Sequence, residues 1–373
     1  MNILFIRNVD ISKTHHVNCE IQLVKAFNKL GHKAKLIGIG KENNFGTEII
    51  LLKSPFNKRR FYLIKLFFFL PIYCISKKVD VVIVDTPIIF GTFLLLLLKN
   101  IFSIKIILDV RSIPVEDKLP IEYKFSCSIA NKYFNGATFI TKGTKDYIEK
   151  LINKNFKNSA IFPSAVNPIL FSQAASNNIA QNIKEKLDGR IVLFYHGSIS
   201  PNRGINLILD AITQIKTEIP KTLFLSLSSN NNYISKYCES KKYNLEDNIL
   251  LLDIVQHEKV PSYIKLADLC IVPLPRILWW EISSPLKVME YLAMEKPIIL
   301  SDIEAHRSIV SSNSDFALYF NPEKSNDLTD KILNGIENLE YLKSKASMGR
   351  EIILKKYTWQ IQANVIENFV NCL

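Results

Sequence analysis

The chain has 373 residues, of which 48% are hydrophobic, and it carries a formal net charge of +12. This length is enough for two ordinary domains, and the composition excludes collagen-like, disulfide-scaffold and low-complexity classes. The Lys and Arg residues are spread along the sequence without a basic stripe interleaved with aromatic residues, so we expect no nucleic-acid partner. An anionic lipid surface or an acidic small molecule would suit the positive charge.

The six cysteines are scattered and include no Cys-x-x-Cys pair. The sequence therefore suggests neither a zinc ribbon nor a disulfide framework. Unpaired thiols fit a reducing compartment, so we expect a cytoplasmic protein. No metal-ligand cluster is visible in the sequence, and we expect no bound metal or other cofactor.

The first part of the chain alternates apolar strands with helices, which predicts a parallel α/β sheet. Asn2 to Arg7 has the pattern of a buried strand, a helix runs from near Glu20 to His32, and Ala34 to Ile37 completes a βαβ unit. The polar loop after the first strand contains His15 and His16. We predict that these two histidines contact an acceptor or a phosphate; the alternative is that they are ordinary solvated loop residues.

A basic cluster, Lys58-Arg59-Arg60, precedes the almost wholly apolar run Phe61 to Ile75. Lys65 and Pro71 interrupt this run, which is shorter than the roughly 20 apolar residues that a membrane-spanning helix needs. Two interpretations follow. The run is either a buried helix of the first domain or an interfacial helix whose basic flank meets anionic lipid headgroups.

Lys105 to Val110 is predicted to be another buried strand, with Asp109 and Arg111 at its carboxyl end. Open α/β sheets bind ligands at that edge, so both residues are candidate catalytic groups. The alternative is an Asp–Arg pair that only shapes the turn. The polar residues after Phe171 suggest an interdomain linker, and we place the first domain at residues 1–180 and the second at residues 181–356.

The second domain opens with a strand, Ile191 to Tyr195, followed by a loop of small residues. The loop contains Gly197, Ser198 and Gly204, and its backbone is suited to close approach of a phosphate. Arg203 adds a planar group with several hydrogen-bond donors, which suits a departing diphosphate. Glycines in such turns are common, so this loop alone is weak evidence.

A second candidate stretch begins at Ser283-Ser284-Pro285 and continues into a short helix predicted from Leu286 to Met294. Serine before proline is a good helix start, and the exposed N–H groups of a helix start attract anions such as a diphosphate. Glu290 follows about one and a half turns later, where its carboxylate would accept hydrogen bonds from a ribose diol. The alternative is an ordinary amphipathic helix.

Taken together, four features of the chain resemble the retaining glycosyltransferases of family 4, also called group 1. They are the Ser-Pro-Leu-Lys helix that carries Glu290, the Gly197 to Gly204 loop, the helix ending in Ala267-Asp268, and Thr358-Trp359 before the last helix. The resemblance implies a GT-B fold, with two Rossmann-like doubly wound α/β domains, a cleft between them, and a C-terminal helix (357–373) that completes the first domain.

The resemblance also implies site roles: Glu290 binds the ribose, and the start of its helix together with Arg203 holds the diphosphate. Two positions depart from the family pattern. Ile282 stands where the first Glu of a Glu-x7-Glu pair is usual, with Glu281 one residue out of register, and Ser198 stands where an Arg is usual.

The implied activity is transfer of a sugar, with retention of configuration, from a UDP- or GDP-sugar to a hydroxyl of a glycan or lipid-linked acceptor. The implied setting is polysaccharide or lipopolysaccharide synthesis, with possible peripheral contact at the inner face of the plasma membrane. A non-catalytic nucleotide-sugar-binding relative and a GT-B-type nucleotide-sugar epimerase are the alternatives.

Overall fold

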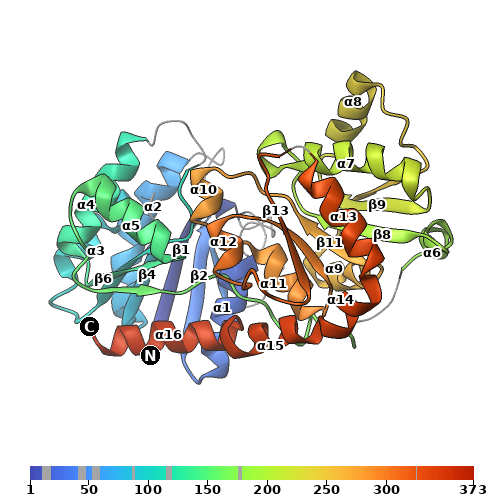
Figure 1. Ribbon diagram of the computed structural model, residues 1–373. Helices are drawn as coiled ribbons and strands as arrows, with labels where there is room; N and C mark the ends of the chain where they lie inside the picture. Colours follow the sequence, from blue (N-terminus) through green and yellow to red (C-terminus); the bar gives the residue numbers. More distant parts are fainter. Residues whose placement is uncertain are drawn as a thin grey trace. The chain divides into compact units, whose positions relative to one another are not determined.

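The computed structural model describes residues 1–10, 18–40, 48–52, 59–85, 89–114, 120–174, 179–324 and 326–373. The chain forms two compact units (Figure 1): unit 1 comprises Met1–Ser164 and Trp359–Leu373, and unit 2 comprises Ala165–Thr358. The domain boundary inferred from the sequence, at residue 180, lies later in the chain than the division after Ser164.

Unit 1 is built on a seven-stranded parallel sheet in the order β3-β2-β1-β4-β5-β6-β7. Its strands are β1 (Asn2–Asp10), β2 (Lys33–Ile39), β3 (Ile49–Leu52), β4 (Val81–Asp85), β5 (Lys105–Val110), β6 (Gly136–Phe139) and β7 (Ser159–Ile161). Its helices are α1 (Asn18–Lys29), α2 (Arg59–Ser76), α3 (Ile89–Leu98), α4 (Ile121–Tyr133), α5 (Lys142–Ile152) and α16 (Trp359–Asn371). The central strands are mainly apolar because helices cover a parallel sheet on both faces; Arg7 on β1 and Asp109 on β5 are buried exceptions.

The C-terminal helix α16 is part of unit 1 and packs against α1. His32, just beyond α1, places its Nε2 3.0 Å from Oε1 of Glu367 on α16. Phe369 lies so close to β6 that a Cβ on Gly136 would be 2.7 Å from its ring. The last residues of the chain therefore complete the core that the first residues begin.

Unit 2 is built on a six-stranded parallel sheet in the order β10-β9-β8-β11-β12-β13. Its strands are β8 (Ile191–His196), β9 (Thr222–Ser228), β10 (Ile249–Asp253), β11 (Leu269–Val272), β12 (Ile298–Ser301) and β13 (Ala317–Phe320). Its helices are α6 (Gln181–Leu187), α7 (Ile205–Glu218), α8 (Asn231–Lys241), α9 (Val260–Ile264), α10 (Leu278–Glu281), α11 (Leu286–Ala293), α12 (Glu304–Arg307), α13 (Asp327–Glu337), α14 (Leu339–Lys345) and α15 (Ser347–Lys356).

Successive residues of β8 enter two separate apolar layers of unit 2. Val192 and Phe194 belong to one buried cluster, and Leu193 and Tyr195 belong to the other. This alternation is expected for a strand with helices on both faces. In each unit the first strand, β1 or β8, lies between the second and the fourth strands of that unit. The order in which strands are added to the sheet therefore reverses at the same point in both units. The predicted doubly wound α/β architecture is confirmed.

Among the described residues, no helix has both the length and the apolar character needed to cross a bilayer. Helix α2, the apolar run of the sequence, buries Tyr62, Leu66, Leu70 and Cys74, which are spaced four residues apart. Its other side is exposed, so the buried-helix interpretation describes only one of its faces.

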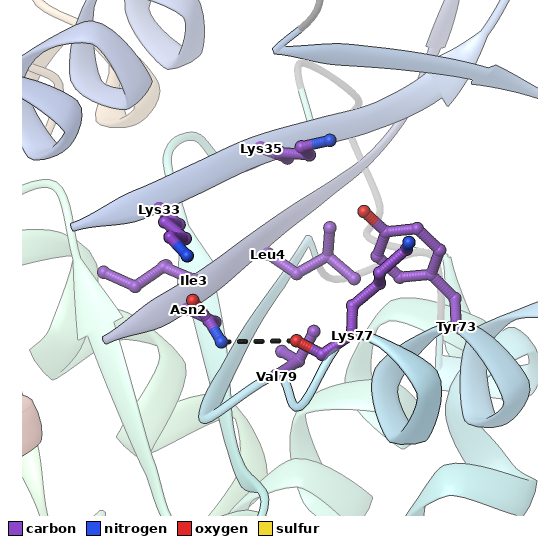
Figure 2. A pocket seen from close by; sticks show the side chains of 8 residues that line it. All are labelled: Asn2, Ile3, Leu4, Lys33, Lys35, Tyr73, Lys77 and Val79. Atoms are coloured by element: carbon purple, nitrogen blue, oxygen red, sulfur yellow. Dashed lines mark hydrogen bonds between the residues drawn. The ribbon is translucent and has the colours of Figure 1, made fainter.

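Unit 1 has a cavity of about 250 Å³ near the beginning of β1 and β2. Figure 2 shows the side chains that line it. An Asn2 side-chain N–H donates to the carbonyl of Lys77 beside it, at 3.2 Å. The lining residues are Asn2, Ile3, Leu4, Lys33, Lys35, Tyr73, Lys77 and Val79. The cavity lies at the amino edge of the sheet, and none of the residues predicted to form the site lines it.

Candidate functional site

The loop after β8 contains two glycines whose backbones require them. Gly197 has a φ of +114°, and a Cβ there would lie 2.7 Å from Cε of Lys287. Gly204 has a φ of +71°, and a Cβ there would lie 1.8 Å from the carbonyl oxygen of Pro273. Both φ values lie in the region that side chains disfavour. Gly204 therefore fixes the loop against the end of β11, and Gly197 leaves room for the Lys287 side chain.

Lys287, in the first turn of α11, extends toward this loop. Its Nζ donates a hydrogen bond to the Tyr195 hydroxyl at 3.2 Å and lies 4.5 Å from the centre of the Tyr195 ring. Burial and the nearby positive charge of Arg203 lower the pKa of Lys287 to about 7, against an opposing effect of Glu290. The cost of holding this charge in its present surroundings favours an added anion.

Arg203 is the second cation of the site and lies in the short helix η4 (Pro201–Arg203). Its guanidinium stacks over the Trp280 ring at 4.8 Å, and the Trp280 indole N–H donates to the Asn202 carbonyl at 2.6 Å. Trp280 therefore holds the loop through both a cation–π contact and a hydrogen bond. The Trp280 side chain also packs against the buried apolar cluster of unit 2 that contains Val192 and Phe194.

Helix α11 starts at Leu286, as predicted, and ends at Ala293. Pro285 occupies the N-cap position and makes no side-chain capping bond. The Ser283 hydroxyl donates to the Trp280 carbonyl at 2.8 Å instead of capping the helix. The first N–H groups of α11 and the helix dipole thus add to the positive potential around Lys287.

Glu290 is buried between two histidines. His257 places its Nε2 2.7 Å from Glu290 Oε1, and His196 Nε2 lies 3.0 Å from Oε2 in an orientation outside hydrogen-bond geometry. Burial by itself would raise the pKa of Glu290, but the two histidines outweigh burial and lower it to about 2. In turn, Glu290 outweighs the effect of burial on His257 and raises its pKa.

Glu281 and Ser198, which mark the two departures from the family pattern, both make defined contacts in the structure. Glu281, the acid nearest the missing one, accepts a hydrogen bond from the Glu304 backbone N–H at 2.7 Å and so caps α12. Ser198 is exposed, and its carbonyl accepts a hydrogen bond from the Tyr195 hydroxyl at 2.8 Å. Because Tyr195 also contacts Lys287, the backbone at Ser198, where an Arg is usual, is linked to a lysine from α11.

Asp109, predicted as catalytic, is fully buried in unit 1. Its carboxylate forms an ion pair with Arg7 and accepts a hydrogen bond from the Thr138 hydroxyl at 2.9 Å. Arg7 also donates from Nε to Glu20 at 3.0 Å. The partner of Asp109 is thus Arg7 rather than the neighbouring Arg111 that the turn-shaping alternative proposed.

Arg111 contacts Phe162, near the end of the first segment of unit 1. It donates to the Phe162 carbonyl at 2.7 Å, and its guanidinium lies 4.1 Å from the centre of the Phe162 ring. These contacts place Asp109 and Arg111 in different surroundings. His15, His16 and Lys58 lie outside the described residues, as do the side chains of Arg59 and Arg60.

In unit 2 the structure brings together Gly197, Arg203, the start of α11 and Glu290, as the sequence predicted. Lys287, His196 and His257 were not among the predicted site residues. Lys287 follows Leu286 and His196 precedes Gly197, so both are neighbours of predicted site residues in the sequence. That proximity is the signal by which the sequence could have indicated them. His257 lies far from them in sequence, and only the fold reveals its contact with Glu290. Within the described ranges, no three His, Cys, Asp or Glu side chains are arranged to share a metal ion.

Comparison with known proteins gives a consistent result. Residues 190–338 match the model of the family described as "Glycosyl transferases group 1". Anabaena HepE in complex with UDP has a TM-score of 0.80 and 13% identity, covering 100% of this chain and 100% of that one. A search of curated proteins finds no match to this sequence.

Two further solved structures are similar over nearly their whole length. Sucrose-phosphate synthase from Thermosynechococcus elongatus has a TM-score of 0.77 and 16% identity, covering 100% of this chain and 98% of that one. A glycosyltransferase from Rickettsia africae has a TM-score of 0.76 and 14% identity, with coverage of 99% and 97%.

Together with the two doubly wound sheets, these likenesses define the class of the protein: its fold is that of the GT-B glycosyltransferases. The matched residues, which make up most of unit 2, resemble the group 1 glycosyl transferases.

Proposed function

We propose that the enzyme transfers a sugar from a UDP-sugar to a hydroxyl of a glycan or lipid-linked acceptor, with retention of configuration. The observation that carries this proposal is the pair of cations, Arg203 and Lys287, beside Gly197 at the positive end of α11. A diphosphate is the part of a nucleotide sugar that such a group of donors and charges would bind.

Lys287 supplies the positive charge that Ser198 does not. A Cβ at Gly197 would lie 3.2 Å from Lys287 Nζ, so the ammonium group occupies the space directly beside the loop. An arginine at the position of Ser198 and a lysine from α11 would each present a cation to the same phosphate group. Moving the cation from the loop to helix α11 preserves the positive charge of the site. This supports an active enzyme over a non-catalytic relative.

In the reaction that we propose, the acceptor oxygen bonds to the anomeric carbon while the bond from that carbon to the diphosphate oxygen breaks. The departing oxygen keeps the electron pair and takes up the acceptor's hydroxyl proton. Arg203 and Lys287 stabilise the negative charge that develops on the diphosphate, which is where positioned cations lower a barrier most effectively.

Glu290 and His257 form the proposed ribose contact. Glu290 is 1% exposed, whereas the His257 side chain is 27% exposed, so His257 is the more accessible of the two. Each carboxylate oxygen accepts more than one hydrogen bond. We assign Glu290 to ribose recognition together with His257, whose ring it orients.

The choice of UDP over GDP is supported by the structural neighbour HepE, whose structures include complexes with UDP and with UDP-glucose. We propose a cytoplasmic enzyme of cell-surface polysaccharide or lipopolysaccharide synthesis. Support for the cytoplasmic location comes from the cysteines, all six of which are free.

Product analysis with radiolabelled UDP-glucose and GDP-mannose, each with glycan and lipid-linked acceptors, tests the proposal. We expect labelled glycoside from the UDP-sugar, with the donor's anomeric configuration shown by NMR. An epimerised nucleotide sugar would instead identify an epimerase. UDP binding without turnover of any donor would indicate a non-catalytic relative, and tighter calorimetric binding of GDP would overturn the choice of base.

A further inference from the structure

Unit 1 carries large exposed apolar side chains on three consecutive helices. More than half of the exposed large hydrophobic residues of the described chain lie between residues 61 and 125. We call the helical members of this group the apolar face: Phe61, Ile64, Phe68, Ile72 and Ile75 on α2, Phe90, Phe93 and Leu97 on α3, and Ile121 and Phe125 on α4. Scattered exposed hydrophobic residues are normal, but a gathered set indicates an interaction surface.

The spacing of these residues places them in rows. On α2 they follow one another at intervals of three or four residues, and on α3 the same intervals separate Phe90, Phe93 and Leu97. Side chains at such intervals share one side of a helix. The opposite side of α2, marked by Leu66 and Leu70, is buried in the unit. Each row is thus an outward-facing stripe on a helix anchored along its inner side.

The three helices lie next to one another, so the rows form one surface. A Cβ on Gly91 of α3 would lie 2.9 Å from Leu66 Cβ of α2, and this close approach brings the two helices together. Across the other boundary, the rings of Phe90 on α3 and Phe125 on α4 stack with centroids 6.4 Å apart. The apolar face is therefore continuous from α2 to α4.

The charges on these helices are mainly positive. Helices α2 and α3 contain no acidic residue, and Glu122 is the one acid of α4. Lys65 lies on the exposed side of α2, and Lys124 precedes Phe125 on α4; both are exposed. Net positive charge over the whole chain, +12, adds a long-range attraction to anionic surfaces.

We propose that the apolar face docks on the surface of an anionic lipid bilayer. In a bilayer interface the aromatic and aliphatic rows enter the headgroup and acyl boundary, and lysines such as Lys65 extend to the phosphates. A second protein copy is a poorer fit, because lysine is depleted from protein interfaces and a buried lysine there requires a carboxylate partner.

Docking goes beyond the chemistry of the nucleotide site, since it needs no nucleotide. Its consequence for substrate class does rest on the proposed function: a transferase held at a bilayer acts on an acceptor hydroxyl at the lipid surface. The acceptor we infer is therefore lipid-linked rather than a free oligosaccharide.

Co-sedimentation of the full chain with vesicles of phosphatidylcholine and phosphatidylglycerol (7:3) tests the docking. We expect sedimentation at low salt, less at high salt because screening weakens surface attraction, and little with pure phosphatidylcholine. The double variant Phe68→Ser/Ile72→Ser should bind at least about tenfold more weakly, because each lost side chain removes several buried carbon groups. Failure of wild type to sediment at low salt would overturn the proposal.

Matched controls separate the face from general properties of the chain. Ile169→Ser/Leu354→Ser removes two exposed apolar side chains from unit 2 and should leave vesicle binding within about twofold. Lys65→Ser should weaken binding more than Lys33→Ser, which removes the same charge at the cavity of Figure 2.

Equal loss in the face variant and its control would overturn the proposal. So would light scattering that shows a dimer lost in the Phe68→Ser/Ile72→Ser variant while vesicle binding persists. Calorimetry with UDP on each variant keeps the two proposals apart: UDP binding should be unchanged by the face variant, and its absence from wild type would count against the nucleotide site alone.

Discussion

Both sheets have charged residues near equivalent central strands, but the balance of positive and negative charge differs between the two units. In unit 1, Arg7 on β1 is matched by the carboxylates of Glu20 and Asp109. In unit 2, beyond the end of β8, the Arg203 charge lowers the pKa of Lys287. The first cluster holds two carboxylates against one guanidinium and so has no excess of positive charge, whereas the second keeps such an excess. One framework can therefore hold a structural ion pair in one unit and an anion site in the other.

The largest effect should come from breaking the buried cluster of Arg7, Glu20 and Asp109. Asp109→Ala leaves the buried Arg7 without one of its two carboxylates, and we expect unit 1 to lose about 3–5 kcal/mol of stability. Urea denaturation followed by circular dichroism measures this. Asp188→Ala removes an exposed carboxylate and should change stability by less than about 0.5 kcal/mol. A normal stability with lost turnover would instead support the catalytic role that the sequence predicted for Asp109.

The next effect concerns Arg203 in the charged site. Arg203→Ala should lower turnover by about 10²–10³-fold, because the negative charge on the diphosphate grows as its bond to the sugar breaks. Initial rates at saturating donor measure this, and Arg203→Lys should recover part of the loss by restoring a charge without the planar group. Turnover near the wild-type value in the alanine variant would make Arg203 a structural residue that packs on Trp280.

Glu290 should affect nucleotide affinity more than turnover. Glu290→Ala removes a charged hydrogen-bond acceptor worth roughly 1.5–3 kcal/mol, so UDP should bind more than tenfold more weakly in calorimetry. His257→Ala should show a smaller loss in the same direction, because Glu290 remains. Equal affinity in the Glu290 variant and wild type would refute the ribose assignment.

The smallest effect is a pH dependence of nucleotide affinity. Lys287 has a pKa of about 7, below its ordinary value, so it is charged below that pH and loses its charge as the pH rises. A bound diphosphate favours the charged form, and UDP affinity should fall by up to about tenfold per pH unit above pH 7. The charged or titratable groups that act with Lys287 are Tyr195, His196, Arg203, Glu290 and His306.

Calorimetry in buffers of different ionisation enthalpy should then show proton uptake on UDP binding at pH 8, and no uptake in Lys287→Met. The methionine variant should unfold no earlier than wild type, because it replaces a charge held in unfavourable surroundings. Uptake that persists in the methionine variant would assign the proton to another group.

Much of this fold could be predicted from local patterns. Alternating strands and helices predicted both parallel sheets, and the start of α11 was predicted at the observed residue, Leu286. The loop of small residues after β8 was visible in the sequence itself, whereas the placement of the final helix in the first domain came from the family resemblance at Thr358-Trp359.

Contacts between distant residues could not be predicted in this way. The pairing of Asp109 with Arg7 and that of Glu290 with His257 depend on which strands and helices become neighbours, and no local pattern encodes this. The outward row on α2 was present in the spacing of Phe61 to Ile75, but an almost wholly apolar sequence conceals which side faces water. Lys287 could be assigned to the site only from the fold, which places its side chain beside Gly197.

Helix α16 has a consequence for biosynthesis on the ribosome. Unit 1 consists of one segment made before unit 2, Met1–Ser164, and one made after it, Trp359–Leu373. From the later segment, α16 supplies Phe369 beside Gly136 and the Val370 carbonyl for the Lys105 ammonium. Unit 2 is one uninterrupted segment, Ala165–Thr358, and can finish folding earlier. During translation, the Met1–Ser164 segment therefore keeps the surface beneath α16 uncovered until Trp359–Leu373 has left the exit tunnel. A premature stop before Trp359 would release it in that state.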